Sequence, residues 1–301
     1  IRKAADGLAS RPALEPAVAK RLQQISHTAG EHAADVDRAA PADAELAADE
    51  AAAGCGSTGS SANAGTEAAA SAGAGSAGCV IANRLSADKN SSVLLLEAGG
   101  KDTNLFIHMP AGYSQLVPNA NPSNYGYETE PDANVGGRRM YWPRGRGWGG
   151  SSSINAMVYI RGNAADYDQW AQAGNTGWSY DEVLPYFKRA ESFEGSGDDS
   201  YHGYDGPLAV KKSDRTDDIL LDRFIEAGQQ AGFPFTDDFN GRQQEGFSRY
   251  EHTMKGSRRC SAAQAYLHPV KKRLNLTIIS HGDDALWLKF LASDLGNIYT
   301  F

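Results

Sequence analysis

Hydrophobic residues recur at two spacings between residues 72 and 281, and together the two spacings predict a mixed α/β protein. Apolar residues three and four positions apart predict amphipathic helices, over 76–86, 163–173, 180–193, 216–232 and 257–269. Short apolar runs predict buried strands, over 91–100, 206–213 and 274–280. Residues 102–140 show little periodicity and are expected to form a long loop region. Because helices and strands are interspersed, we expect an α/β fold rather than an all-α or all-β one.

The helical pattern is clearest over residues 216–232, where the apolar side chains fall on one face. These side chains are Ile219, Leu220, Phe224 and Ala227. Gly232 follows them and is the expected stop signal, because glycine readily adopts the left-handed conformation that ends many helices. At the start of the helix expected over 180–193, Ser179 and Glu182 have the spacing of a capping box.

Residues 1–71 differ in composition from the rest of the chain and are expected to be disordered. They are rich in Ala, Asp, Glu, Gly and Ser, with one short helix expected around 15–26. Between 33 and 71 nearly every apolar residue is Ala, which buries too little area to offset the entropy lost on ordering. We therefore separate this low-complexity segment from the folded region that begins at residue 72.

The overall composition excludes several classes of protein. The chain has 301 residues, 41% of them hydrophobic, and a formal net charge of −8; this acidic balance argues against nucleic-acid partners, which select basic patches. No apolar run is long enough to span a bilayer, and the sequence does not open on a signal peptide. Cys55, Cys79 and Cys260 are too few and too scattered for a disulfide framework or a metal site. We expect a soluble protein whose free thiols favour a reducing compartment, with the localisation otherwise unknown.

A dinucleotide-binding motif stands at the start of the folded region. Gly73, Gly75 and Gly78 fit the pattern G-x-G-x-x-G, in which the glycines allow a tight turn, admit a pyrophosphate close to the backbone and pack the helix on the strand. The N-terminus of the helix then presents free N–H groups and a positive dipole end to the phosphates. Glu97 ends the next strand, about 20 residues further on, where a carboxylate can accept hydrogen bonds from a ribose hydroxyl.

The strand that should precede this motif departs from the usual pattern. Residues 66–72 read TEAAASA and contain no Val, Ile, Leu or aromatic residue. Buried parallel strands are normally near-continuous apolar runs. We therefore expect a weak first strand and weakened cofactor binding.

A second glycine-rich stretch, residues 141–162, reads YWPRGRGWGGSSSINAMVYIRG and combines a small-residue backbone with Trp, Arg, Asn and Met side chains. Here the sequence resembles the glucose–methanol–choline (GMC) family of flavin-dependent oxidoreductases, especially its choline-dehydrogenase-like members. The segments GAGSAGCVIANRLS, VLLLEAGG and DYDQWAQAGNTGWSYDEVLPYF carry the same resemblance. The likeness runs over 72–281, and residues 282–301 form a tail unlike the family.

The resemblance implies an FAD-binding Rossmann-like domain with part of an α+β substrate domain. The residues that it assigns to FAD are Gly73, Gly75, Ser76, Ala77, Gly78, Glu97, Gly149, Gly150, Ser151, Asn155, Ala156, Met157 and Val158. Ser151 and Asn155 would hydrogen-bond the cofactor, and Ala156–Val158 would lie near the isoalloxazine ring. Some family members attach the flavin through a His just before the Asn; Ile154 stands at that position here, which implies non-covalent FAD.

The activity that the resemblance implies is oxidation of a small-molecule alcohol, with hydride transfer to flavin N5 and an external electron acceptor that the sequence does not identify. In the family a His near the C-terminus acts as the base, and the chain carries no segment resembling that region. None of its histidines (His27, His32, His108, His202, His252, His268 and His281) sits in the family's catalytic context. We therefore expect an N-terminal portion with unknown catalytic residues and little or no turnover.

Three alternatives stay open at this point. The first is a non-catalytic fragment that binds flavin or only scaffolds, favoured by the missing base and the poor first strand. The second is a nicotinamide-dependent Rossmann dehydrogenase, which the first glycine motif permits but which has no need of Gly145–Asn155. The third is a lyase acting on cyanohydrins, which reuses the same fold without redox turnover.

Overall fold

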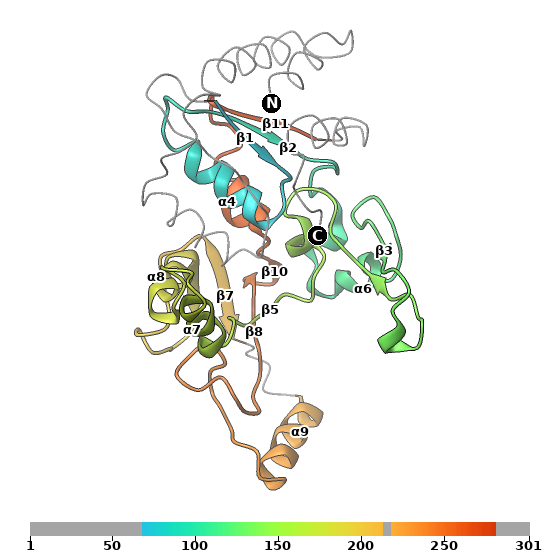
Figure 1. Ribbon diagram of the computed structural model, residues 1–301, viewed down its shortest axis with the longest axis vertical. Coiled ribbons are helices and arrows are strands. Elements are labelled where there is room, and N and C mark those ends of the chain that lie inside the picture. Colours follow the sequence, from blue (N-terminus) through green and yellow to red (C-terminus); the bar gives the residue numbers. More distant parts are fainter. Residues whose placement is uncertain (1–67, 213–217, 281–301) are drawn as a thin grey trace.

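The computed structural model describes residues 68–212 and 218–280, with side chains from residue 73 onward. The helix expected around 15–26 and the tail 282–301 lie outside these residues. Figure 1 shows a parallel sheet at one end of the molecule, a second sheet with two helices in the middle, and helix α9 (Ile219–Gln230) at the other end. No helix in the described ranges is long and apolar enough to cross a membrane.

The first sheet contains three parallel strands in the order β1 (Ala68–Ala72), β2 (Ser92–Leu96) and β11 (Leu276–Ile279). The central strand β2 buries Val93–Leu96, as expected for a strand covered on both faces. β1 pairs with β2 along its whole length, from Ala68 opposite Ser92 to Ala72 opposite Leu96. The Ala-rich sequence thus forms the strand, because the ladder is made by backbone groups. All of β1 except Ala72 lies within the segment 1–71, so the expectation of disorder is wrong for the last residues of that segment.

Helix α4 (Ser76–Leu85) connects β1 to β2 and packs against a π-helical segment, Ala263–Leu267. Its buried face carries Ala77, Val80 and Ile81, the spacing that predicted the helix. The main core lies between these elements and the sheet; its largest members include Val93, Leu95, Trp148, Tyr266 and Leu267. This core fixes where α4 begins, and therefore where the glycine motif is placed.

The second sheet has four strands in the order β5 (Val158–Tyr159), β8 (Glu251–His252), β7 (Leu208–Lys212) and β6 (Glu191–Glu194). Only the β6–β7 pair is parallel. Helices α7 (Ala164–Gln172) and α8 (Tyr180–Ala190) lie beside this sheet (Figure 1).

The expected capping box of α8 is confirmed, with the Glu182 carboxylate 3.0 Å from the Ser179 backbone nitrogen. The helix expected over 180–193 is too long, because the chain turns extended at Glu191 and enters β6. That change brings the fully buried Glu191 carboxylate to Arg161 and His202. The pairing of Glu191 with Arg161 and His202 therefore accounts for the end of α8 at Ala190, although the helical pattern continues to 193.

The expectation of a long loop over 102–140 is wrong, because the region contains short elements. These are α5 (Leu105–His108), α6 (Tyr113–Leu116), the 3-10 turns Pro110–Gly112 and Ala133–Val135, and β3 (Tyr127–Glu128), which pairs with β4 (Tyr141–Trp142). The buried side chain of Asn124 organises them: its amide nitrogen donates to Leu116 O and Val117 O, and its oxygen accepts from Arg144 N. Hydrophobic periodicity cannot reveal elements this short.

The helix expected over 257–269 is also wrong in its first part. β9 (Met254–Lys255) turns into β10 (Arg258–Arg259), and helical structure begins only afterwards as the π-helical segment. The reason lies at Arg259, whose buried guanidinium binds carbonyl groups of two other segments. An extended backbone here directs that side chain inward.

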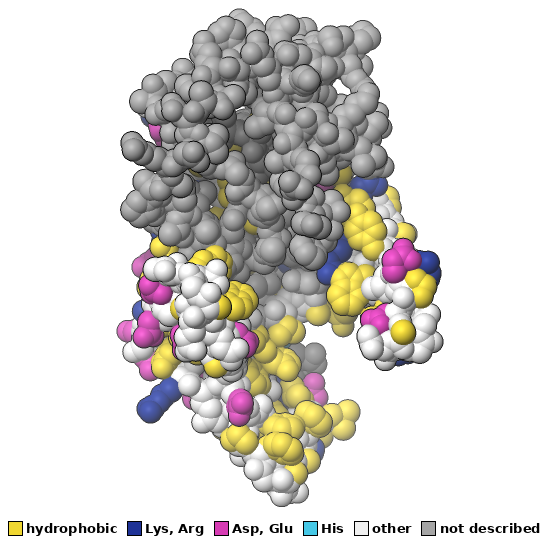
Figure 2. Space-filling view, viewed as in Figure 1, with side chains coloured by type: hydrophobic (Ala, Val, Ile, Leu, Met, Phe, Trp, Pro, Cys, Tyr) yellow, Lys and Arg dark blue, Asp and Glu magenta, His cyan; other side chains and the backbone are white. Residues whose placement is uncertain are grey.

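Helix α9 exposes the apolar residues that the pattern placed on one face. Ile219, Leu220 and Phe224 are exposed, and the buried positions are Ile225 and Gly228. Phe247 packs so closely on Gly228 that a β-carbon there would lie 2.5 Å from its ring. Figure 2 shows hydrophobic side chains gathered at this end of the molecule. Gly232, with φ of +91°, follows the helix, in agreement with its role as the stop signal.

Candidate functional site

The two glycine motifs, far apart in the sequence, touch each other in the structure. Gly149 N donates to Ala74 O at 2.6 Å, and a β-carbon at Gly150 would lie 2.8 Å from Gly75 Cα. Gly149 and Gly150 have φ of +87° and +51°, in the left-handed region that favours glycine. A side chain at either position would strain the backbone, and one at Gly150 would also push the two motifs apart.

The Glu97 carboxylate joins both motifs to the end of β2. One oxygen accepts from Ala74 N at 2.6 Å, and the other accepts from Gly99 N at 2.7 Å and Gly147 N at 2.9 Å. The side chain is buried. Hydrogen bonds to an ionised group are among the stronger ones in proteins, so Glu97 ties three segments together at one point.

The N-terminus of α4 points into this junction without a side-chain cap among the described residues. Gly75 is its N-cap residue, and the space that a β-carbon would take there holds no atom within 4 Å. The first N–H groups of a helix have no partner within the helix. Ser76 is half-buried, whereas Ala77 and Gly78 are buried beneath it.

The segment after the 3-10 turn Gly150–Ser153 lies at the surface and carries backbone strain. Asn155, Ala156 and Val158 are exposed, as is Ser151 within the turn itself. Met157 between them is buried with φ of +65°, a conformation uncommon outside glycine that tends to occur at functional sites. It is held by Asn155, whose Oδ1 accepts from Met157 N at 3.0 Å, and by Thr253 N, which donates to Met157 O at 2.8 Å.

Arg259, a residue that the sequence analysis missed, lies behind this segment. Its Nε donates to Ile107 O at 2.7 Å, and its Nη1 donates to Asn155 Oδ1 at 2.7 Å and Ser152 O at 3.2 Å. The side chain is 2% exposed, and burial lowers its pKa to about 10. The neighbouring Arg258 is exposed, so only long-range contacts distinguish the two arginines.

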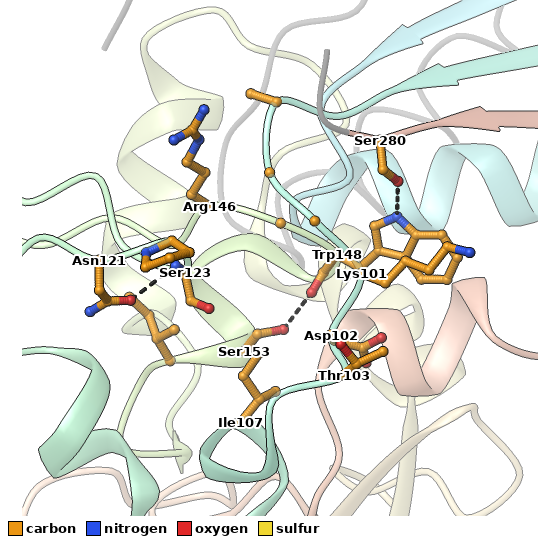
Figure 3. Close-up of a pocket in the computed structure, with 16 residues that line it drawn as sticks. Lys101, Asp102, Thr103, Ile107, Asn121, Ser123, Arg146, Trp148, Ser153 and Ser280 are labelled. Carbon is orange, nitrogen blue, oxygen red and sulfur yellow. Dashed lines mark hydrogen bonds between the residues drawn. The ribbon is translucent and has the colours of Figure 1, made fainter. Parts of the chain in front are cut away.

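A cavity of about 730 Å³ adjoins the glycine junction. Residues after β2, residues 121–123, residues 146–148 and Ser280 line it (Figure 3). Trp148 Nε1 donates to Ser280 Oγ at 2.8 Å across its wall. The residues predicted to bind FAD are not among those lining the cavity, but their sequence neighbours Ala98, Trp148 and Ile154 are.

Asp102 on the wall of this cavity forms a hydrogen-bonded pair with His268 that the sequence did not indicate. Its carboxylate lies 2.8 Å from His268 Nε2 and accepts from Gln264 Nε2 at 2.9 Å. Burial opposes ionisation, yet these hydrogen bonds hold the pKa of Asp102 below its usual value. The pair fastens the π-helical segment to the loop after β2.

The other described histidines lie in different places. His108 contacts the backbone of Asp102, and the buried His202 lies between the carboxylates of Glu191 and Asp238. His252 stands opposite Val158 in the β5–β8 pair, and burial lowers its pKa. His27, His32 and His281 lie outside the described residues.

The cysteines in the described part of the chain, Cys79 and Cys260, are free and buried. Burial raises the pKa of both thiols. A raised thiol pKa disfavours the reactive thiolate. The two residues therefore belong to the core and not to the chemistry of the site. Cys55 lies outside the described residues.

A glycine turn before a helix N-terminus, with an acidic residue after the next parallel strand, defines the class of dinucleotide-binding βαβ proteins. Comparison with known proteins specifies this class further. Residues 52–283 match the sequence model of the GMC oxidoreductase family. The chain belongs to the GMC oxidoreductase family.

Curated relatives and solved structures agree with this assignment. The chain is 51% identical to an oxygen-dependent choline dehydrogenase of Photobacterium profundum over 204 residues, covering 67% of this chain and 36% of that protein. It is 50% identical to the mitochondrial choline dehydrogenase of Mus musculus over 210 residues, covering 67% of this chain and 34% of that protein. Among solved structures, pyridoxine 4-oxidase from Mesorbium loti superposes with a TM-score of 0.66 at 37% identity, covering 71% of this chain and 42% of that one. The chain thus spans little more than a third of the length of these choline dehydrogenases.

Proposed function

We propose that this chain is the FAD-binding portion of an oxidoreductase that acts on CH–OH donors. The observation that carries the proposal is the junction of the two glycine motifs around Glu97 and the open N-terminus of α4. Bound FAD would supply the chemistry, by accepting a hydride from the alcohol carbon at N5. We infer a choline-like alcohol as the substrate class, because the curated relatives named above are choline dehydrogenases.

The residues at the junction fit a dinucleotide. Among the described residues, no atom fills the space at Gly75 and no side chain caps the first turn of α4, an arrangement that suits a diphosphate group. Three of the acceptor positions of the Glu97 carboxylate are used by backbone N–H groups, and a carboxylate offers about four in all. The remaining one suits a ribose hydroxyl. Gly73 and Gly78 would keep the turn and the helix packing that this arrangement needs.

The flavin ring would lie over the exposed segment that begins at Ser151. Asn155, Ala156 and Val158 present this surface, and the strained Met157 turns the backbone beneath it. Ile154, buried against Ile107 and Leu116, has no nucleophilic atom. We therefore infer that the cofactor is bound without a covalent bond to this position.

A flavin-binding role without turnover is the second candidate. The exposure of Asn155, Ala156 and Val158 favours it, because water at the ring face weakens the electrostatic stabilisation of a reacting group. We also infer the domain division 1–71, 72–281 and 282–301, with the refinement that β1 belongs to the folded region.

The visible absorbance of the purified chain tests these proposals. After incubation with FAD and desalting, we expect a flavin spectrum that moves into the supernatant on acid precipitation. Anaerobic addition of choline then separates the two candidates, since bleaching indicates an oxidoreductase and an unchanged spectrum indicates binding alone. A folded chain that stays colourless would overturn both the oxidoreductase and the flavin-binding role without turnover. A flavin that remains in the precipitate would overturn the inference of non-covalent binding.

A further inference from the structure

Arg259 is a buried cation that no carboxylate neutralises within the described part of the chain. Its hydrogen bonds all go to neutral oxygens, on Ile107, Ser152 and Asn155. Its Nη2 is buried and finds no partner among the described residues. An unpaired buried charge is costly, and arginine is rarely buried to this degree without an anion. The arrangement therefore points to an anionic group that is supplied when a ligand binds.

The contacts of Arg259 lead to one residue of the proposed flavin surface. Asn155 Oδ1 accepts from both Arg259 Nη1 and Met157 N, at 2.7 and 3.0 Å. Both donors approach the same oxygen, so the orientation of the amide is fixed and its NH₂ group is turned away from them. The positive charge and the fixed amide thus act on the same exposed surface.

Resting on the proposed FAD site, we propose that Arg259 positions Asn155 and supplies a positive charge behind the flavin ring, favouring the reduced, negatively charged form of FAD. Arg259 itself does not contact the substrate in this proposal. A fixed charge that is itself buried away from water is weakly screened, and so favours a neighbouring group that gains negative charge. The reduced flavin is then the anionic partner that the guanidinium otherwise lacks.

Two substitutions separate the charge of Arg259 from its geometry. Arg259→Gln removes the charge, and we expect at least a tenfold loss of preference for the reduced form, equivalent to about 30 mV for a two-electron couple. Arg259→Lys keeps the charge but cannot form the fork to Ile107 O and Asn155 Oδ1. We expect it to retain a potential close to that of the parent while the Kd for FAD rises several-fold. Arg258→Gln is the control, because it removes the same charge from the exposed neighbouring residue in β10.

The readouts are the Kd for FAD from fluorescence titration and the potential of bound FAD from anaerobic reduction against a reference dye. Equal potentials in Arg259→Gln, Arg258→Gln and the parent would overturn the proposal, as would Arg259→Lys behaving like Arg259→Gln. Failure of the parent itself to bind FAD would instead overturn the proposed function. The two results are therefore distinguishable.

Asn155→Asp provides an independent test if Arg259→Gln does not fold. Asn155 is exposed, so an isosteric carboxylate is tolerated there and gives Arg259 a permanent counter-charge. We expect a higher melting temperature without FAD and at least a tenfold weaker preference for the reduced form. An unchanged melting temperature and an unchanged potential would overturn the proposal.

Discussion

The Glu97 carboxylate accepts a hydrogen bond from Gly147 N at 2.9 Å, across 50 residues of sequence. This contact links the end of the dinucleotide-binding βαβ unit to the second glycine motif. A β-carbon at Gly99 would lie 2.4 Å from the same Gly147 nitrogen, so the close approach also requires glycine. The two motifs therefore form one structural unit, in which loss of either is expected to affect both folding and FAD binding.

Replacement of Glu97 by Gln is expected to lower stability and weaken FAD binding together. Gln presents one oxygen and one NH₂ group, so at least one of the N–H donors of Ala74, Gly99 and Gly147 loses its acceptor. A buried donor without a partner costs roughly 1–3 kcal/mol. Urea unfolding and FAD titration measure the two effects, with Glu128→Gln on the exposed strand β3 as the control. Equal stability and equal FAD affinity of the two variants would show that the Glu97 hydrogen bonds contribute to neither property.

Gly150→Ala is expected to disrupt the contact between the glycine motifs. The new methyl group would lie 2.8 Å from Gly75 Cα, at a position with φ of +51°. Gly136→Ala is a matched control, because it has φ of +71° and no atom within 4 Å of the added carbon. Both variants incur the left-handed strain of roughly 1–2 kcal/mol, and Gly150→Ala adds an overpacking cost of about 1–3 kcal/mol.

Chemical denaturation measures the difference in the free energy of unfolding between the two glycine variants. FAD titration shows whether the substitution also weakens cofactor binding. We expect only Gly150→Ala to lose FAD affinity. Equal destabilisation of the two variants would mean that the motifs do not need their close contact.

Short motifs and regular periodicity were readable from the sequence because their residues are close together in the chain. The glycine patterns, Glu97 and helix α4 are of this kind. Arg259 and the Asp102–His268 pair are not, because their partners lie 104 and 166 residues away. A sequence does not distinguish the buried Arg259 from the exposed Arg258, since only the fold decides which side chain faces inward.

Helix α9 illustrates a different failure, in which the helix was predictable but its packed face was not. The pattern placed Ile219, Leu220 and Phe224 on one face, yet the residues that the structure buries are Ile225 and Gly228, with Phe247 packed against Gly228. Amphipathic spacing shows that apolar residues share a face, but not whether a neighbouring element covers it. The exposed residues form an apolar surface at one end of the molecule (Figure 2).

Leu220→Lys is therefore expected to leave stability unchanged and to reduce self-association. Leu220 is 81% exposed, and a surface substitution changes stability by only about 0.5 kcal/mol. Ile225→Ala, on the buried face of the same helix, should cost roughly 2–5 kcal/mol. Urea unfolding measures stability, and light scattering against protein concentration measures association. Strong destabilisation by Leu220→Lys would contradict the observed orientation of α9.

His202 is expected to make the protein less stable at alkaline pH. Burial favours its neutral form, but hydrogen bonds to Asp238 at 2.7 Å and Glu191 at 3.1 Å raise its pKa from 6.5 to about 9. The folded state therefore holds a proton that the unfolded state releases as the pH rises above 6.5. The stabilisation is complete below that pH and is lost as the pH rises through about 9.

Urea unfolding at a series of pH values tests this prediction. We expect the free energy of unfolding of the parent to fall by roughly 1–3 kcal/mol between neutral and alkaline pH, relative to His202→Gln. His252→Gln is the control, because burial lowers the pKa of His252 and its loss should leave the alkaline decline intact. A parallel pH profile for His202→Gln and the parent would show that the Glu191–His202–Asp238 cluster does not hold the proton, and would assign the decline to other groups.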